Sequence, residues 1–77
     1  MQKLLQDMNI GKNLQRIRKT RKMSQKDVLI QMALKGRTMI ETTYSRIEQG
    51  KRNIFVSDLV LLKEIFDVDY NEFFEGL

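Results

Sequence analysis

The residues whose side chains are best suited to recognise a ligand lie in the stretch IETTYSRIEQGKRN, residues 40–53. Thr42, Thr43 and Arg46 occupy the polar side of this helix-like run. An Arg guanidinium can donate to O6 and N7 of guanine, and a Thr can contact base edges through its hydroxyl or the thymine methyl through its own methyl group. These three side chains are therefore candidates for contacts with base edges in the major groove of duplex DNA.

Five further residues have the chemistry expected of phosphate contacts: Ser24, Gln25, Ser45, Lys51 and Arg52. Ser24 and Gln25 begin a predicted helix, where free backbone N–H groups and the helix dipole attract an anion. Lys51 and Arg52 follow Gly50 at the end of the polar run. Cations in that place also complement the helix dipole, and the two roles are compatible.

Composition removes most other kinds of chemistry. The 77-residue chain has no cysteine and no histidine, which excludes disulfides, thiolate catalysis and the usual zinc sites. It contains no glycine-rich phosphate loop, and its acidic C-terminal residues (Asp67, Asp69, Glu72 and Glu75) are better explained as helix caps and a solvated tail. We therefore expect no enzyme, no cofactor, no metal and no small-molecule ligand.

The net charge of +4 is distributed unevenly along the chain. Residues 1–40 hold ten Lys or Arg against two acids, whereas residues 41–77 hold four against eight. This asymmetry favours one half that faces a polyanion, although a lysine-rich solvated surface would give the same counts. Because no stretch has the length and apolar character of a signal peptide or a membrane span, we expect a soluble cytoplasmic protein without a membrane partner.

The apolar spacing predicts an all-α domain over residues 10–75, preceded by an extension, residues 1–9, that is also compatible with a helix. Proline is absent and helix-forming residues are frequent. Helix starts are expected at four possible caps, namely Asn9, Ser24 with Asp27, Ser57, and Asp69 with Glu72.

The helix that contains the polar run is expected to begin at Thr38, because Thr38 and Glu41 have the spacing of a capping box. Ile40, Tyr44 and Ile47 recur at helical spacing and should face the core. Gly50 should end the helix.

Three stretches taken together resemble the phage-repressor-like (Xre, Cro or C1-type) helix-turn-helix family, in that family's order. They are IGKNLQRIRKTRKMSQKDV, YSRIEQGKRN and LKEIFDVDYNEFF, and the resemblance covers about residues 10–75. The connection around MALKGRTMI is longer than usual and matches an extended subgroup. The resemblance implies a five-helix repressor-like domain in which the helix of the polar run enters the major groove.

The resemblance also implies particular roles for several residues. Glu41 joins the base-contact candidates, in competition with its expected capping role, and Gln25 matches a family position that touches the DNA backbone. Arg18 and Glu48 match a buried ion pair that joins the first and third helices. A transcriptional regulator, expected to be a repressor, would bind a palindromic operator in double-stranded DNA as a homodimer.

One alternative uses the same fold differently. The domain could be a protein-interaction module, such as an antitoxin that binds a protein partner and also represses its own promoter. The aromatic residues Tyr70, Phe73 and Phe74 are where such a contact, or a dimer contact, would be expected. Packing of these rings into the core is the simpler explanation and is favoured over such a contact.

Overall fold

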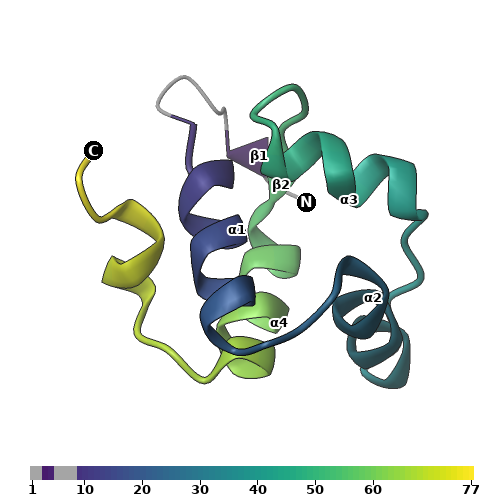
Figure 1. Ribbon diagram of the computed structural model, residues 1–77. Coiled ribbons are helices and arrows are strands. Elements are labelled where there is room, and N and C mark those ends of the chain that lie inside the picture. The colour runs from purple at the N-terminus through teal and green to yellow at the C-terminus, as the bar shows by residue number, and fades with distance from the viewer. Residues whose placement is uncertain (1–2, 5–8) are drawn as a thin grey trace.

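Helices build almost all of the fold in the part of the chain that the computed structural model describes, residues 3–4 and 9–77 (Figure 1). In chain order they are α1 (Gly11–Thr20), α2 (Gln25–Leu34), α3 (Glu41–Glu48), α4 (Val56–Phe66) and the 3-10 helix η1 (Tyr70–Phe74). The prediction of an all-α fold is confirmed. None of these helices combines the length and the apolar character needed to cross a bilayer.

A short antiparallel sheet was not predicted. Strand β1 (Lys3–Leu4) pairs with β2 (Ile54–Phe55), with Leu4 opposite Ile54. The expectation of a helix in the N-terminal extension is therefore wrong for residues 3–4. The rest of that expectation, on residues 1–2 and 5–8, lies outside the described residues.

The core lies where the apolar faces of all the helices meet. Its buried side chains are Ile10, Leu14, Ile17, Val28, Met32, Tyr44, Ile47, Ile54, Leu59, Leu62, Phe66 and Phe73. The 3-10 helix closes one side, since Asn13 Nδ2 donates to the backbone oxygens of Phe73 and Glu75, both at 2.9 Å. Of the three C-terminal aromatic residues, only Phe73 is core, whereas Tyr70 and Phe74 are exposed.

The predicted start of α2 is confirmed. Ser24 Oγ accepts from the Asp27 amide at 3.0 Å, and an Asp27 carboxylate oxygen accepts from the Ser24 amide at 2.8 Å, which completes a capping box. Gly36 stops α2, and Gly50, with φ of 74°, stops α3. After α3 the Gly50 amide donates to Ile47 O and the Lys51 amide to Arg46 O, which is the Schellman pattern.

The predicted start of α3 is wrong. The helix begins at Glu41, its N-cap is Ile40, and no side chain caps it. The Thr38 carbonyl, which would have to accept the first helical hydrogen bond, accepts from Arg37 Nη1 at 2.9 Å instead. The same guanidinium pairs with buried Asp58 of α4 at 2.8 and 3.3 Å and so holds this connection extended. Ile40 is consequently 73% exposed and does not face the core.

Two other cap predictions are also wrong, and a third is right in position only. Asn9 has a left-handed φ of 50° and α1 begins after Ile10 instead. Ser57 lies inside α4, because the β2 pairing continues to Phe55 and the helix starts directly after it. Asp69 is the N-cap of η1, as predicted, but its side chain makes no capping hydrogen bond.

Candidate nucleic-acid interface

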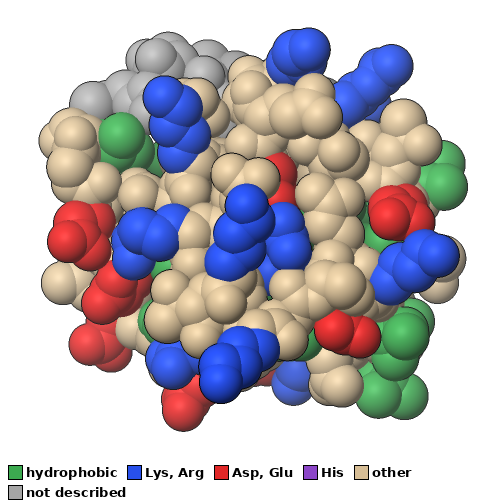
Figure 2. Space-filling model, in the orientation of Figure 1, with side chains coloured by type: hydrophobic (Ala, Val, Ile, Leu, Met, Phe, Trp, Pro, Cys, Tyr) green, Lys and Arg blue, Asp and Glu red, His purple; other side chains and the backbone are tan. Residues whose placement is uncertain are grey.

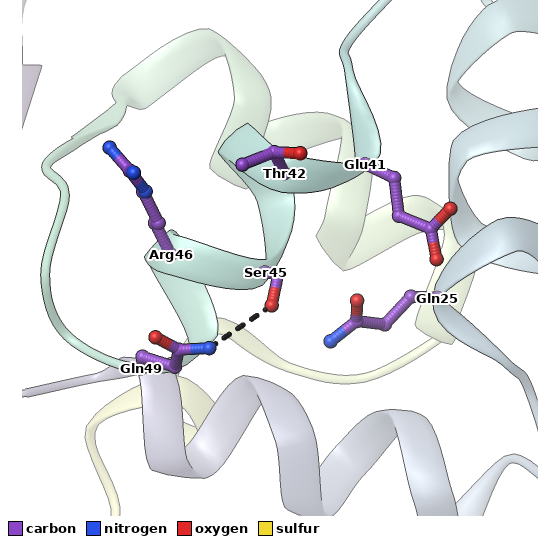
Figure 3. A pocket seen from close by; sticks show the side chains of 6 residues that line it. All are labelled: Gln25, Glu41, Thr42, Ser45, Arg46 and Gln49. Carbon is purple, nitrogen blue, oxygen red and sulfur yellow. Dashed lines mark hydrogen bonds between the residues drawn. The ribbon is translucent and has the colours of Figure 1, made fainter.

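A polar hollow of about 370 Å³ lies between the outward face of α3 and the start of α2 (Figure 3). Its lining residues are Gln25, Glu41, Thr42, Ser45, Arg46 and Gln49. Five of the six come from α3 or its C-cap. Four of these five, from Thr42 to Gln49, have the i, i+3, i+4 and i+7 spacing that places side chains on neighbouring rows of one helix surface. Every lining side chain is polar or charged, so the hollow has the chemistry of a hydrogen-bonding surface.

Three of the four predicted base-contact residues lie on this surface. Thr42 and Arg46 are exposed, and in Figure 3 the Arg46 guanidinium points away from the protein body. Glu41 is exposed on the side of the hollow next to Gln25, and it does not cap α3. Thr43 is half-buried and is not part of the lining, because it lies between this face and the buried face that carries Tyr44.

The predicted phosphate-contact residues do not all lie in the hollow. Gln25 and Ser45 line the hollow, and Ser45 Oγ lies 3.2 Å from Gln49 Nε2. Lys51 and Arg52 are exposed in the turn that follows α3. Ser24 is not in the lining, since its hydroxyl caps α2.

A buried ion pair fixes α3 against α1. Arg18 Nε and Nη2 donate to the two carboxylate oxygens of Glu48 at 2.8 and 3.0 Å, with both side chains less than 10% exposed. The hydrogen bonds that Arg18 donates to Glu48 raise the pKa of the Arg18 guanidinium, so the pair stays charged. Gln25 Nε2 donates to the same Glu48 carboxylate at 3.2 Å and ties α2 to the pair. The ion pair that the family resemblance implies is therefore present and links three helices.

Tyr44 lies beside this pair with its ring in the core. The side chain is 1% exposed, and its hydroxyl has no hydrogen-bond partner among the described residues. Burial, reinforced by the negative charge of Glu48, raises the pKa of the Tyr44 phenol far above its ordinary value. The neutral phenol is thus strongly favoured in the folded state.

The stability of the fold should therefore depend on Tyr44 at alkaline pH. The unfolded phenol ionises near pH 10, whereas the folded one does not, so the Tyr44 contribution is constant below pH 10 and falls by about 1.4 kcal/mol for each pH unit above it. Urea unfolding at pH 8 and pH 11 should show a loss larger by about that amount in the wild type than in Tyr44→Phe. Equal losses in the two proteins would show that Tyr44 ionises freely in the fold.

A second hollow of about 290 Å³ adjoins the first and shares Gln25, Ser45 and Gln49 with it. Its further lining includes Lys12 and Gln15 of α1. Neither residue was predicted to belong to the site, because both lie far from the polar run in sequence. Gln49 was also missed as a site residue, although its position, three residues after Arg46 and seven after Thr42, could have identified it.

The charged side chains are not evenly spread over the surface. Figure 2 shows a group of acidic side chains at the left edge, where η1 lies in Figure 1, and single acidic side chains among the Lys and Arg of the rest of that view. No group of three or more Asp or Glu side chains in the described part of the chain could hold a metal ion. Models of known protein families give no match to this chain, and curated sequences and solved structures give no significant match.

Proposed function

We propose that the protein is a sequence-specific DNA-binding regulator of the phage-repressor-like helix-turn-helix type, expected to act as a repressor. The observation that carries this proposal is the face of α3, where Thr42, Arg46 and Gln49 form one exposed polar row above a buried apolar face.

The neighbouring helices support this proposal. In a helix-turn-helix the second helix lies in the major groove and the first crosses the backbone. Here α3 would be the reading helix, and the N-terminus of α2, with Gln25, would meet one DNA strand. Lys51, in the turn after α3, would meet the phosphates on the other side of the groove. The described part of the chain has four α-helices and the 3-10 helix η1, which is compatible with the five helices that the resemblance implies.

The Arg18–Glu48 pair would contribute to this function by holding α3 in a fixed position. A base contact distinguishes one base pair from another only if the reading helix is held at a fixed depth and angle. The pair fastens α3 to α1, and the Arg37–Asp58 pair fastens the connection that precedes α3 to α4. The start of α3 is therefore held in place, although the connection between α2 and α3 is long.

Titration of labelled duplex DNA tests the proposal through two variants with different expected results. Arg46→Ala should weaken binding to a preferred duplex by about 1–3 kcal/mol and relax the preference at one base pair, because it removes a contact to a base edge. Lys51→Ala should weaken binding to all duplexes about equally and lower the salt dependence, because it removes a phosphate contact.

Lys35→Ala provides the control for these two variants. Lys35 is exposed, pairs with Glu64 and does not line either hollow, so its removal should leave sequence preference unchanged. If Arg46→Ala bound every duplex as Lys35→Ala does, α3 would not be the reading helix.

A further inference from the structure

The cations of α1 and its C-terminal turn fall into two sets. Arg16, Arg18 and Arg21 are engaged: Arg16 with Glu72 and Glu75, Arg18 with Glu48, and Arg21 with the backbone oxygens of Phe66 and Asp67. Lys12, Lys19 and Lys22 are exposed and make no side-chain hydrogen bond or ion pair with the described residues. Three positive charges on α1 and the turn after it thus have no partner among the described residues.

These three lysines form a ridge along α1, which we call the α1 ridge. Lys12 and Lys19 are seven residues apart, so they lie on the same side of the helix and roughly 10 Å apart along its axis. Lys22 follows in the turn that leads to α2, and α1 carries no acidic residue. Arg16, which lies between Lys12 and Lys19, is paired with Glu72 and Glu75, so the available charge of the ridge comes from its lysines.

The α1 ridge adjoins the proposed reading surface. Lys12 lines the second hollow together with Gln25 and Gln49. Lys22 precedes the capping residue Ser24 by two positions, and it adopts a φ of 58° that is unfavourable for a residue with a side chain. The ridge thus extends from the hollow to the turn before the α2 N-terminus, where a DNA backbone would pass.

We infer that the α1 ridge is a second phosphate-binding surface, which engages the backbone of duplex DNA outside the base pairs that α3 reads. This inference rests on the proposed function and extends it. A DNA strand carries one phosphate for every 3.4 Å of helix axis, so a ridge of this length spans about three phosphates. The ridge contains no planar hydrogen-bonding group, so it would add affinity and salt dependence without sequence preference.

The experiment compares the ridge variant Lys19→Gln/Lys22→Gln with the control variant Arg16→Gln/Lys35→Gln. Both remove two positive charges, but the control charges are already paired with acids. Each protein is titrated with a duplex that just covers the preferred sequence and with one extended by about ten base pairs at each end. Titrations of a motif-free duplex of fixed length are repeated at several salt concentrations.

On the extended duplex, the wild type and the control variant should bind roughly two- to thirtyfold more tightly than on the short one, and the ridge variant should lose most of this gain. The slope of log affinity against log salt should fall by about 1.8 in the ridge variant, the value for two phosphates. Lys19→Gln alone, which leaves the turn unchanged, should give about half of that effect.

The inference would be overturned if the ridge variant kept both the salt slope and the tighter binding to the extended duplex. It would also be overturned if the ridge and control variants lost equal amounts of affinity and salt dependence. The proposed function fails separately. If duplex DNA binds without any preferred sequence, specific regulation is wrong, while the salt slopes on motif-free duplex still decide the role of the ridge. If no duplex binds at all, both are wrong.

Discussion

Replacing Glu48 by alanine is expected to lower the free energy of unfolding by about 3–5 kcal/mol. The substitution leaves the Arg18 guanidinium buried without its carboxylate, and Gln25 loses its acceptor. The whole stability of a domain of this size is about 4–12 kcal/mol, so such a loss should also lower the melting temperature strongly. Urea unfolding followed by circular dichroism measures the change directly.

Two further variants separate the ion pair from other effects. Glu41→Ala removes an exposed glutamate from the same helix and should change stability by less than about 0.5 kcal/mol. Replacing both partners, as in Arg18→Met/Glu48→Leu, should recover much of the loss, because no buried charge then remains unpaired. A Glu48→Ala protein as stable as Glu41→Ala would mean that the pair is not buried in solution.

The double variant also tests the positional role of the pair. If the pair acts by holding α3 at a fixed angle, a well-folded Arg18→Met/Glu48→Leu protein should still bind duplex DNA but discriminate less between sequences. Retention of the full sequence preference would assign that role to the apolar packing of α3 alone.

Replacing Gly11 by alanine is expected to have the second largest effect, at the upper end of the roughly 1–3 kcal/mol that overpacking costs. A methyl group at this position would overlap the backbone carbonyl oxygens of Ile47 and Glu48. Both are backbone atoms of α3, so the overlap cannot be relieved by a side-chain rotation. The helices α1 and α3 would have to separate, and the Arg18–Glu48 hydrogen bonds would lengthen.

Thermal unfolding of Gly11→Ala and of Gln15→Ala provides the comparison. Gln15 is exposed on the same helix, where alanine is at least as favourable, so its substitution should be close to neutral. Equal melting temperatures for the two variants would show that α1 and α3 do not approach each other as closely as the structure places them.

The helix boundaries show what the sequence could predict. The Ser24–Asp27 capping box and the stops at Gly36 and Gly50 depend on residues within one turn, so local pattern was sufficient. The start of α3 was not predictable in this way. The Thr38–Glu41 spacing is suitable for a cap, but the Arg37–Asp58 pair spans 21 positions and overrides it.

The candidate site likewise contains some residues that the sequence could place and others that it could not. Thr42 and Arg46 could be placed by helical periodicity, because they belong to one short helix. Lys12 could not, since only the packing of α1 against α3 brings it to the hollow next to Gln25. The pairing of β1 with β2 was missed for a similar reason, because two-residue strands 51 positions apart leave no periodic pattern.

Selection of bound sequences from a pool of random duplex DNA tests the central claim most directly. With the wild-type protein the account predicts enrichment of a short motif, and with Arg46→Ala it predicts a relaxed preference at one base pair of that motif. A pool from the wild type that remains random after repeated rounds, at salt concentrations where duplex DNA is bound, would contradict the account.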